Sequence, residues 1–417
     1  MRSDEARDLG RLGAVVLAGA ARRVQEVQEA VAGRAFRAVG PAATPVRAVH
    51  DAVSTGVHAA VRTGLAGGAR AAGLAGALVA DGTPVEQRRS ARTALAVANG
   101  THGDLLRDVA PALALRATVR ADGRDVPLEP AALRNAYPHA RSTVVVLLHG
   151  LTEDERAWCF RSLRHHGRPG VSFATLLEHD LPCTAVLVRY PTGLHVSENG
   201  RAVAALLDGL VAAWPVPVRD LVLVGHSMGG LVARSALHAA GGGTDDAAAW
   251  TRLVRDTVTL GTPHLGAPLE RAAHRAGHLL RRLPETRPVA TLLSTRSAGV
   301  KDLRHGTLVE DDWSGHDPDA PERGPHTLVP LHDGARHFAV LTTIARDPSS
   351  RLGRLLGDGL VTPDSAVGEG ALAFPADHVH RLGGLHHFDL LSEPRVYGQL
   401  LAWLRDRPAP ADDPAAS

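Results

Sequence analysis

Hydrophobic residues recur with one spacing in the first part of the chain and with another in the rest. Over the first hundred residues, apolar side chains recur at steps of three and four, which is the spacing of one face of an amphipathic helix. One stripe comprises Val24, Val27, Val31 and Ala35, and after Gly40-Pro41 a second comprises Val46, Val49, Val53, Val57, Val61 and Leu65. This pattern predicts an N-terminal helical region over residues 1–100.

From about Leu113 the period changes to two. The segments Leu115–Arg120 and Val126–Leu128, joined by Asp122-Gly123, predict a β-hairpin with a tight turn. Beyond it, apolar strands alternate with amphipathic helices. The predicted strands are Val144–Leu148, Ala185–Val188, Leu221–Val224, Thr257–Leu260 and Phe338–Ile344, and the predicted helices are Phe173–Glu178, Arg201–Trp214, Gly230–Ala240 and Pro394–Leu404. Such alternation predicts a mostly parallel, doubly wound α/β sheet covered by helices on both faces.

The predicted α/β domain covers residues 101–408 and contains one long insertion. Residues 265–336 separate two predicted strands and include an amphipathic stretch from Leu269 to Leu283. We expect a cap or lid here, because insertions of this kind exclude water and shape substrate pockets. The last residues, 409–417, are predicted to be a disordered tail.

Composition excludes several classes of protein. Two cysteines among 417 residues rule out a disulfide scaffold or a cysteine-rich zinc module. A formal net charge of +2 with 3% aromatic residues gives no reason to expect a nucleic-acid partner. The longest apolar run, Ala71–Ala80, is far shorter than the roughly 20 residues of a spanning helix. We therefore expect a cytoplasmic protein.

The N-terminal stripes leave two readings open. Small apolar faces usually pack on another helix or on a neighbouring domain, which is the reading we favour. Amphipathic helices can also lie on a lipid surface, which would make the protein membrane-peripheral.

The pentapeptide Gly225-His226-Ser227-Met228-Gly229 is the strongest chemical signal in the chain. It follows an apolar strand and opens a helix, which is the context of a nucleophile elbow. The flanking glycines permit the tight turn that exposes the serine hydroxyl at a helix N-terminus. Ser227 is thus the candidate nucleophile.

An oxyanion hole needs two donors close to the nucleophile. The Met228 N–H, directly after the serine, would supply one. The loop His149-Gly150-Leu151 ends an earlier strand, and its Leu151 N–H is the candidate for the other. We expect His149 to shape this loop and not to act as the base.

A base and an acid are expected later in the chain. His386 and His387, just before the last helix, are both candidates for the base. For the acid, Asp358 lies between two glycines, and Asp364 and Asp347 are rivals. The acid would fix the histidine tautomer and stabilise the imidazolium.

In this order, the motifs HGL, GHSMGG, GTPHLG, GDGLV and HHFDLL resemble the α/β-hydrolase superfamily, and more narrowly its lipase and GPI-inositol-deacylase-like esterases. The resemblance covers about residues 110–406. It implies that Ser227 is the nucleophile, Asp358 the acid and His387 the base. His387 is preferred because the group's pattern of His, apolar residue, Asp, Leu, Leu aligns with residues 387–391. The oxyanion donors carry over to Leu151 and Met228.

The resemblance implies a serine-dependent hydrolase of carboxylic esters that acts through an acyl-enzyme on hydrophobic acyl esters. An acyltransferase or a thioesterase would use the same triad, and a lipid-surface or partner-binding protein with a hydrolase scaffold is a further alternative. Trp158, Phe160 and His264 are candidate substrate contacts. No cofactor is expected. No metal is expected either, since neither the acidic run 310–319 nor the pair His274 and His278 offers a complete ligand set.

Overall fold

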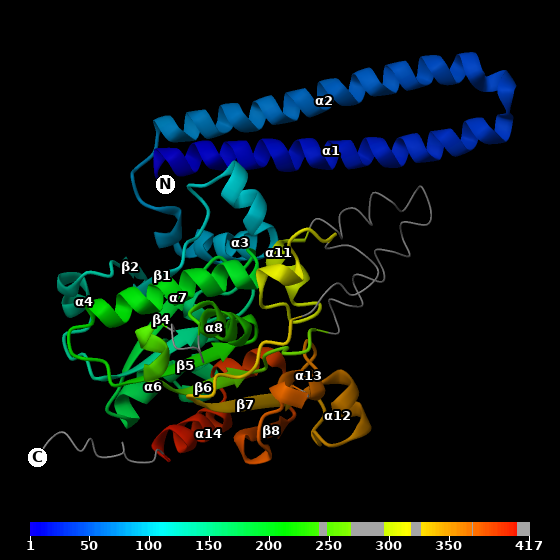
Figure 1. Ribbon diagram of the computed structural model, residues 1–417. Helices are drawn as coiled ribbons and strands as arrows, with labels where there is room; N and C mark the ends of the chain where they lie inside the picture. The colour runs from blue at the N-terminus through cyan, green and yellow to red at the C-terminus, as the bar shows by residue number, and fades with distance from the viewer. Residues whose placement is uncertain (242–247, 268–295, 318–326, 369, 407–417) are drawn as a thin grey trace, which may run out of the picture. The chain divides into compact units, whose positions relative to one another are not determined.

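The computed structural model describes residues 1–417 except 242–247, 268–295, 318–326, 369 and 407–417 (Figure 1). The described residues form two compact units. One comprises residues 1–115 and 296–301, with residue 317, and the other comprises residues 116–241, 248–267, 302–316, 327–368 and 370–406. The predicted amphipathic stretch Leu269–Leu283, the pair His274 and His278, and the predicted tail 409–417 lie outside the described residues.

An eight-stranded sheet forms the centre of the second unit, in the order β2-β1-β4-β3-β5-β6-β7-β8. Its β1 is antiparallel to β2 and β4, and the other pairs are parallel. The strands are β1 (Thr118–Ala121), β2 (Arg124–Val126), β3 (Thr143–Leu148), β4 (Thr184–Arg189), β5 (Asp220–His226), β6 (Val254–Leu260), β7 (Arg336–Thr343) and β8 (Val379–Gly383). The predicted mostly parallel sheet and its leading hairpin are therefore confirmed.

Helices cover both faces of this sheet. The longer helices are α6 (Phe173–Asp180), α7 (Val196–Ala213), α8 (Met228–Ala239) and α14 (Pro394–Arg405), and the shorter ones are α4 (Pro130–Ala136), α5 (Ser162–His166), α12 (Arg351–Leu356) and α13 (Pro363–Val367). Side chains alternate along β3, so Val144 and Val146 pack in one core with α7 and α8. Val145 and Leu147 pack in the other core with α6 and α14. Continuous apolar strands thus reflect a sheet that is buried on both sides.

The sequence prediction missed β8. Its residues include His380 and Arg381, which interrupt the apolar pattern expected of a buried strand. β8 pairs only with β7 and closes one edge of the sheet. An edge strand tolerates polar residues because one side of it faces no neighbouring strand.

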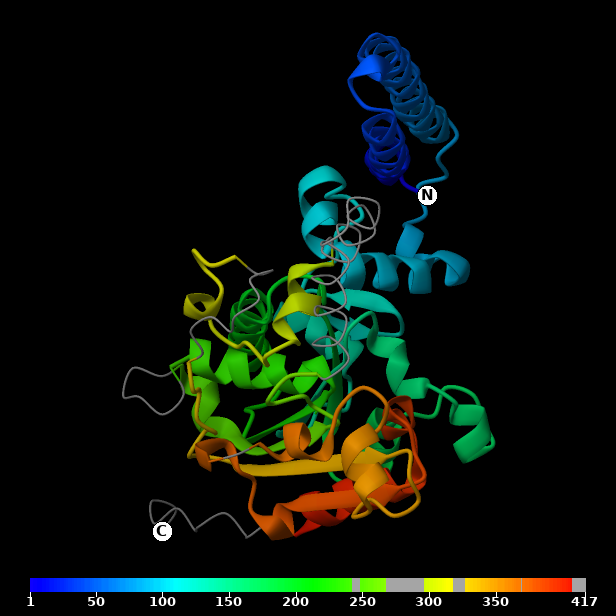
Figure 2. The same cartoon turned by 90° about the vertical axis from the view of Figure 1, so that its right-hand side faces the viewer.

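Three helices make up most of the first unit: α1 (Ser3–Val39), α2 (Thr44–Leu78) and α3 (Arg89–Val109). The first two run side by side as a long antiparallel hairpin (Figures 1 and 2). Small residues form the seam between them, since a Cβ built on Gly10 would lie 2.7 Å from the Cα of Gly73. The valine stripes are not in this seam, and Val53 remains 60% exposed. The stripes therefore do not form the contact between α1 and α2, and their packing on a neighbouring domain stays a prediction.

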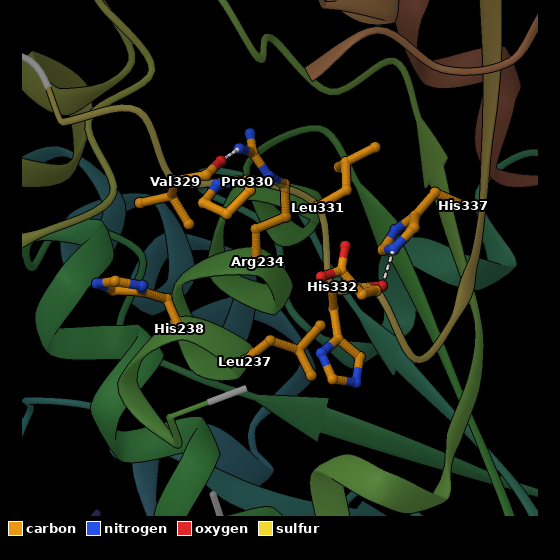
Figure 3. Close-up of a pocket in the computed structure, with 9 residues that line it drawn as sticks. Arg234, Leu237, His238, Val329, Pro330, Leu331, His332 and His337 are labelled. Atoms are coloured by element: carbon orange, nitrogen blue, oxygen red, sulfur yellow. Dashed lines mark hydrogen bonds between the residues drawn. The ribbon is translucent and has the colours of Figure 1, made fainter. Parts of the chain in front are cut away.

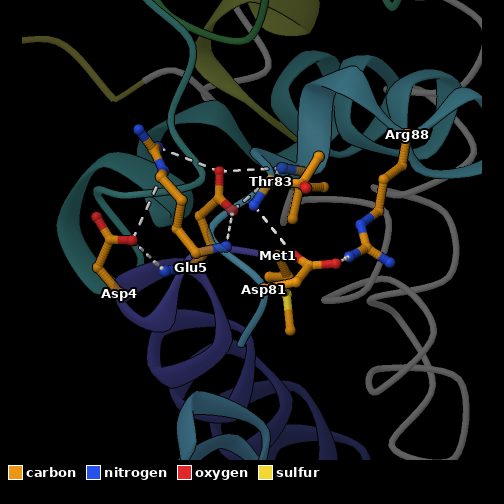
Figure 4. A network of polar contacts seen from close by, with 8 residues as sticks. Met1, Asp4, Glu5, Asp81, Thr83 and Arg88 are labelled. Atoms are coloured by element: carbon orange, nitrogen blue, oxygen red, sulfur yellow. Dashed lines mark hydrogen bonds and ion pairs between the residues drawn. The ribbon is translucent and has the colours of Figure 1, made fainter. Parts of the chain in front are cut away.

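Polar contacts at the base of the hairpin tie its two ends together (Figure 4). Asp81, just beyond α2, accepts from the N-terminal amine of Met1 and from Arg88, and its Oδ1 accepts from Thr83 N at 3.0 Å. Glu5 on α1 pairs with Arg2 at 3.1 Å and accepts from Val85 N at 3.1 Å. These contacts close the first unit around the start of α1.

Within the expected cap insertion, the structure describes the short helix α11 (Ala298–Asp302) and a 3-10 turn at Glu310–Asp312. Among the helices that the structure describes, none has both the length and the apolar composition needed to cross a membrane.

Candidate active site

Ser227 occupies the turn between β5 and α8 in a conformation that side chains rarely adopt. Its φ is 52° and its ψ is −120°, and such strain in a folded protein gathers at functional sites. Packing holds the turn in place, because a Cβ on Gly229 would lie 2.2 Å from the carbonyl oxygen of Leu148. The serine therefore lies at the carboxyl end of β5 and at the N-terminus of α8.

His387 and Asp358 form a buried pair. The His387 Nδ1 donates to Asp358 Oδ2 at 2.6 Å, and each residue is 3% exposed. The other carboxylate oxygen, Oδ1, accepts from the N–H groups of Leu360 and Val361 at 2.9 and 2.8 Å. The carboxylate is thus fully hydrogen-bonded and fixes the orientation of the histidine ring.

The rival candidates lie elsewhere. The partly exposed His386 ring lies 2.7 Å from Arg161 Nη1 and 3.3 Å from Asp389 Oδ1. Asp364 is exposed in the first turn of α13, and Asp347 accepts from Ser349 in an exposed loop. The structure brings together His387 and Asp358, and none of the three alternatives contacts this pair.

Gly261 lies between the serine and this pair. Ser227 N donates to the carbonyl of Leu260 at 2.8 Å, and a Cβ on the next residue, Gly261, would lie 3.2 Å from the His387 ring. Gly261 has a φ of +61°, which favours glycine. The first glycine of the Gly-Thr-Pro-His motif thus lets the histidine ring approach the end of β6 beside Ser227.

The loop after β3 touches the serine from the other side. A Cβ on Gly150 would lie 3.1 Å from the Cβ of Ser227. Gly150 N donates to Glu153 Oε2 at 2.6 Å and Thr152 N to Thr192 Oγ1 at 3.1 Å. Within the described residues, the Leu151 N–H between them has no protein acceptor. This N–H and the Met228 N–H at the start of α8 remain the candidate donors to an oxyanion.

His149 is a buried part of this loop. Its Nδ1 donates to the carbonyl of Gly150 at 3.0 Å, and its ring stacks on Tyr190 with 4.6 Å between centroids. Burial lowers the pKa of His149. A neutral ring that is bonded and stacked in this way supports the loop backbone.

A second buried pair lies beside the serine. His226 Nδ1 is 3.0 Å from Glu153 Oε2, and its Nε2 is 3.3 Å from the carbonyl oxygen of His387. Both partners of the ring are acceptors, so both ring nitrogens must carry a proton to satisfy them. Burial alone would lower the pKa of His226, but the Glu153 carboxylate raises it overall. Burial would raise the pKa of Glu153, but the imidazolium lowers it overall.

This pair links the candidate oxyanion loop to the histidine loop, and sequence reasoning did not find it. In the sequence, His226 stands only as the residue before Ser227 in the pentapeptide 225–229. The sequence feature that could have indicated this pair is Glu153, a carboxylate three residues after Gly150 in the loop that approaches the Ser227 turn.

The candidate substrate contacts fall in different environments. Trp158 is fully buried, with its ring centroid 6.4 Å from that of His226. Phe160 is 37% exposed and its ring lies 6.0 Å from that of Phe388. Phe388, next to His387, is itself 39% exposed. An accessible aromatic pair therefore lies beside the candidate base.

His264 is buried against α8. Its Nδ1 accepts from Arg234 Nη1 at 3.0 Å. Burial, and then the nearby guanidinium, hold the pKa of His264 well below its usual value. Burial lowers the pKa of Arg234 to about 10, so it still carries a charge at neutral pH. The contact joins the loop after β6 to α8.

Arg234 also lines a cavity of about 140 Å³ together with His238, His332 and His337 (Figure 3). The cavity borders the C-terminal half of α8 and the start of β7, whereas Ser227 precedes the first residue of α8. It is thus separate from the serine site. Within the described ranges, no cluster of three or more His, Cys, Asp or Glu side chains is arranged to hold a metal ion.

Comparison with known proteins gives one family match. Residues 202–328 match the model of the PGAP1-like alpha/beta domain, a segment that contains Ser227 but neither Asp358 nor His387. No curated protein sequence matches the chain.

Several solved structures are similar to the chain. The mature lipase BlEst2 of Bacillus licheniformis has 20% identity and a TM-score of 0.38, covering 68% of this chain and 96% of its own. The metagenomic carboxyl esterase MGS0156 has 18% identity and a TM-score of 0.37, covering 68% and 78%. Carboxylesterase CesB of Bacillus subtilis has 11% identity and a TM-score of 0.34, covering 64% and 84%. Because these scores are low, the fold assignment depends on the strand order and the family match.

Proposed function

We propose that this chain is a serine hydrolase of carboxylic esters with an α/β-hydrolase fold, which its strand order and the match of residues 202–328 to the PGAP1-like alpha/beta domain support. One observation carries the proposal. The strained Ser227 follows His226, whose ring centroid lies 4.9 Å from that of His387, and His387 Nδ1 is bonded to a buried carboxylate at 2.6 Å. A hydroxyl, a base and an orienting acid are the parts of an activated nucleophile.

In the proposed first step, His387 Nε2 takes the proton of Ser227 Oγ as that oxygen attacks the ester carbonyl. The carbonyl oxygen becomes an oxyanion between the N–H groups of Leu151 and Met228. The C–O bond to the alcohol then breaks, and His387 returns the proton to the leaving oxygen. The products are an acyl ester of Ser227 and a free alcohol.

Water completes the proposed cycle. His387 removes a proton from water as its oxygen attacks the acyl carbonyl, and Ser227 Oγ leaves with the proton from His387. The carboxylic acid departs and the serine is restored. Throughout, Asp358 keeps the proton on Nδ1, so that Nε2 is free to act.

We further propose that the acyl group is hydrophobic. Phe388 supports this, since it is an accessible aromatic side chain next to His387, and the accessible Phe160 lies against Phe388. Apolar side chains with few polar groups are typical of sites that bind hydrophobic ligands.

A fluorophosphonate probe tests the nucleophile directly, because it attaches to an activated serine. We expect labelling of the wild type at Ser227 and none of S227A. The matched control is S235A, since the hydroxyl of Ser235 on the same helix donates to the carbonyl of Leu308 at 2.7 Å. Equal labelling of S227A and wild type would rule out this serine.

A panel of p-nitrophenyl esters of rising acyl length tests the reaction and the substrate class. Hydrolysis should fall about 10⁴-fold in S227A, since only oxyanion and binding contributions remain. Preference for the longer acyl chains supports the hydrophobic substrate. Addition of an alcohol separates the alternatives, because an acyltransferase would yield mainly the new ester.

A further inference from the structure

The hairpin of α1 and α2 carries two rows of large apolar side chains that are substantially exposed in the part of the chain that the structure describes. On α2 the row consists of Val46, Val49, Val53, Val57, Val61 and Leu65, from 39% to 66% exposed. On α1 it consists of Val24, Val27 and Val31, from 37% to 62% exposed. We call these two rows together the valine face.

The two helices do not need these valines to hold together. Their seam includes Gly10 against Gly73, the bond from Arg62 to Gln25, and the Phe36 and His50 rings 5.3 Å apart. Small residues at a seam allow helices to approach closely. The larger apolar side chains therefore remain outside the contact.

Both rows lie on one side of the hairpin. Val24 comes one residue before Gln25 of the seam, and Val61 one residue before Arg62. Successive residues of an α-helix are rotated by about 100° around the helix axis. Each valine row therefore lies about 100° around its own helix from the residues of the seam, in the same rotational direction along each chain. Because the helices are antiparallel, equal offsets point to the same broad side. The row on α2 alone runs about 28 Å along the helix.

The charge of the hairpin distinguishes between the possible binding partners of the valine face. Residues 20–70, which contain both rows, carry seven arginines and three acidic residues. Neither row contains an acidic side chain. A second copy of the same basic hairpin would be repelled, whereas an anionic surface would be attracted.

We propose that the valine face binds an anionic lipid surface, with the hairpin lying flat in the headgroup region. Its valines enter the apolar boundary, and arginines at its margins meet the lipid phosphates. This inference does not depend on the proposed ester hydrolysis, since it concerns binding alone.

Flotation of the 417-residue chain with lipid vesicles tests whether the valine face binds an anionic surface. The vesicles contain phosphatidylcholine with phosphatidylglycerol in equal parts, or phosphatidylcholine alone. The first variant, V53Q/V57Q/V61Q, removes the centre of the valine face. The matched control, A52Q/T55Q/T63Q, places the same number of glutamines at exposed positions of α2 outside that face. All six sites are exposed, so both variants should keep the helix content of the wild type in circular dichroism.

We expect wild type and control to bind the anionic vesicles, with weaker binding to neutral vesicles and in high salt. The valine variant should lose at least about tenfold in partitioning. Wild-type failure to float, or equal binding by the valine variant, overturns the proposal. A wild-type dimer in sedimentation that becomes monomeric in the valine variant also overturns it, because a second copy would then cover the face.

Discussion

At the scale of single residues, the two adjacent histidines of the last loop differ sharply in environment. The pair between His387 and Asp358 is buried, whereas the His386 side chain is partly exposed beside Arg161. H387A and D358N should each lose about 10⁴-fold in kcat, because the first removes the base and the second its tautomer control. H386A and D364N should stay within about threefold of wild type. Steady-state kinetics of ester hydrolysis compares the four variants. An inactive H386A would show that His386, and not His387, is the base.

The buried pair of His226 and Glu153 makes a prediction about pH. The folded-state pKa of His226 is raised, so its stabilising contribution is complete below the unfolded value of about 6.5 and is lost as pH rises. The folded-state pKa of Glu153 is lowered, so its contribution is complete above about 4.5 and is lost as pH falls. The pair therefore contributes most between about pH 4.5 and 6.5.

E153Q should cost about 3 kcal/mol in that window, because it leaves a buried imidazolium without its counter-charge. The difference from wild type should shrink at higher pH, where His226 is neutral in both proteins. Urea unfolding at several pH values measures this difference in the free energy of unfolding, and titration of His226 by NMR is a second readout. A difference independent of pH would mean that the pair is not ionised.

At the scale of elements, the approach of α8 to β3 depends on one glycine. In G229A the new methyl group would lie 2.2 Å from the Leu148 carbonyl, so the elbow must shift. We expect a loss of at least about 2 kcal/mol in stability together with most of the activity. Gly398 in α14 has no atom near its missing Cβ, so G398A should instead stabilise by about 0.5–1 kcal/mol. Thermal unfolding compares the two.

The seam of the hairpin gives a parallel test in the first unit. G73A places a methyl group 2.7 Å from the Cα of Gly10 and should force α1 and α2 apart. Gly64 on the same helix has open space around it, so G64A should strengthen α2 through helix propensity. Hydrogen exchange of the α1 and α2 amides should rise in G73A and fall in G64A. Slower exchange in G73A would contradict the small-residue seam.

At the scale of the whole molecule, every candidate site residue lies in the second unit, which begins at Arg116. A chain that starts at Arg116 should therefore keep turnover of short esters within about threefold of the full protein. If the valine face serves a lipid surface, the truncation should selectively lose activity on emulsified long-chain esters. Comparison of the two activities before and after truncation is the measurement. A folded truncation that is inactive on every ester would show that the first unit helps to build the site.

The sequence by itself determined the elements and the elbow. Both depend on local rules: a period of two or of 3.6 for the strands and helices, and glycines that flank a serine between a strand and a helix. Where those rules weaken, prediction failed, as at β8 with its polar His380 and Arg381. The residue pattern alone could not decide between two histidines for the base or among three aspartates for the acid. Residues that are close in sequence could place their side chains at nearly the same point in space.

Only the tertiary structure decided which distant side chains meet. It joins His387 to Asp358 across 29 positions and His226 to Glu153 across 73, because strands far apart in sequence end at the same edge of the sheet. It also decided which side of the hairpin helices faces inward. The apolar pattern predicted that the valines pack on another helix or on a neighbouring domain. Between α1 and α2, however, Gly10 and Gly73 allow a closer approach, so small residues form the seam and the valines lie outside it.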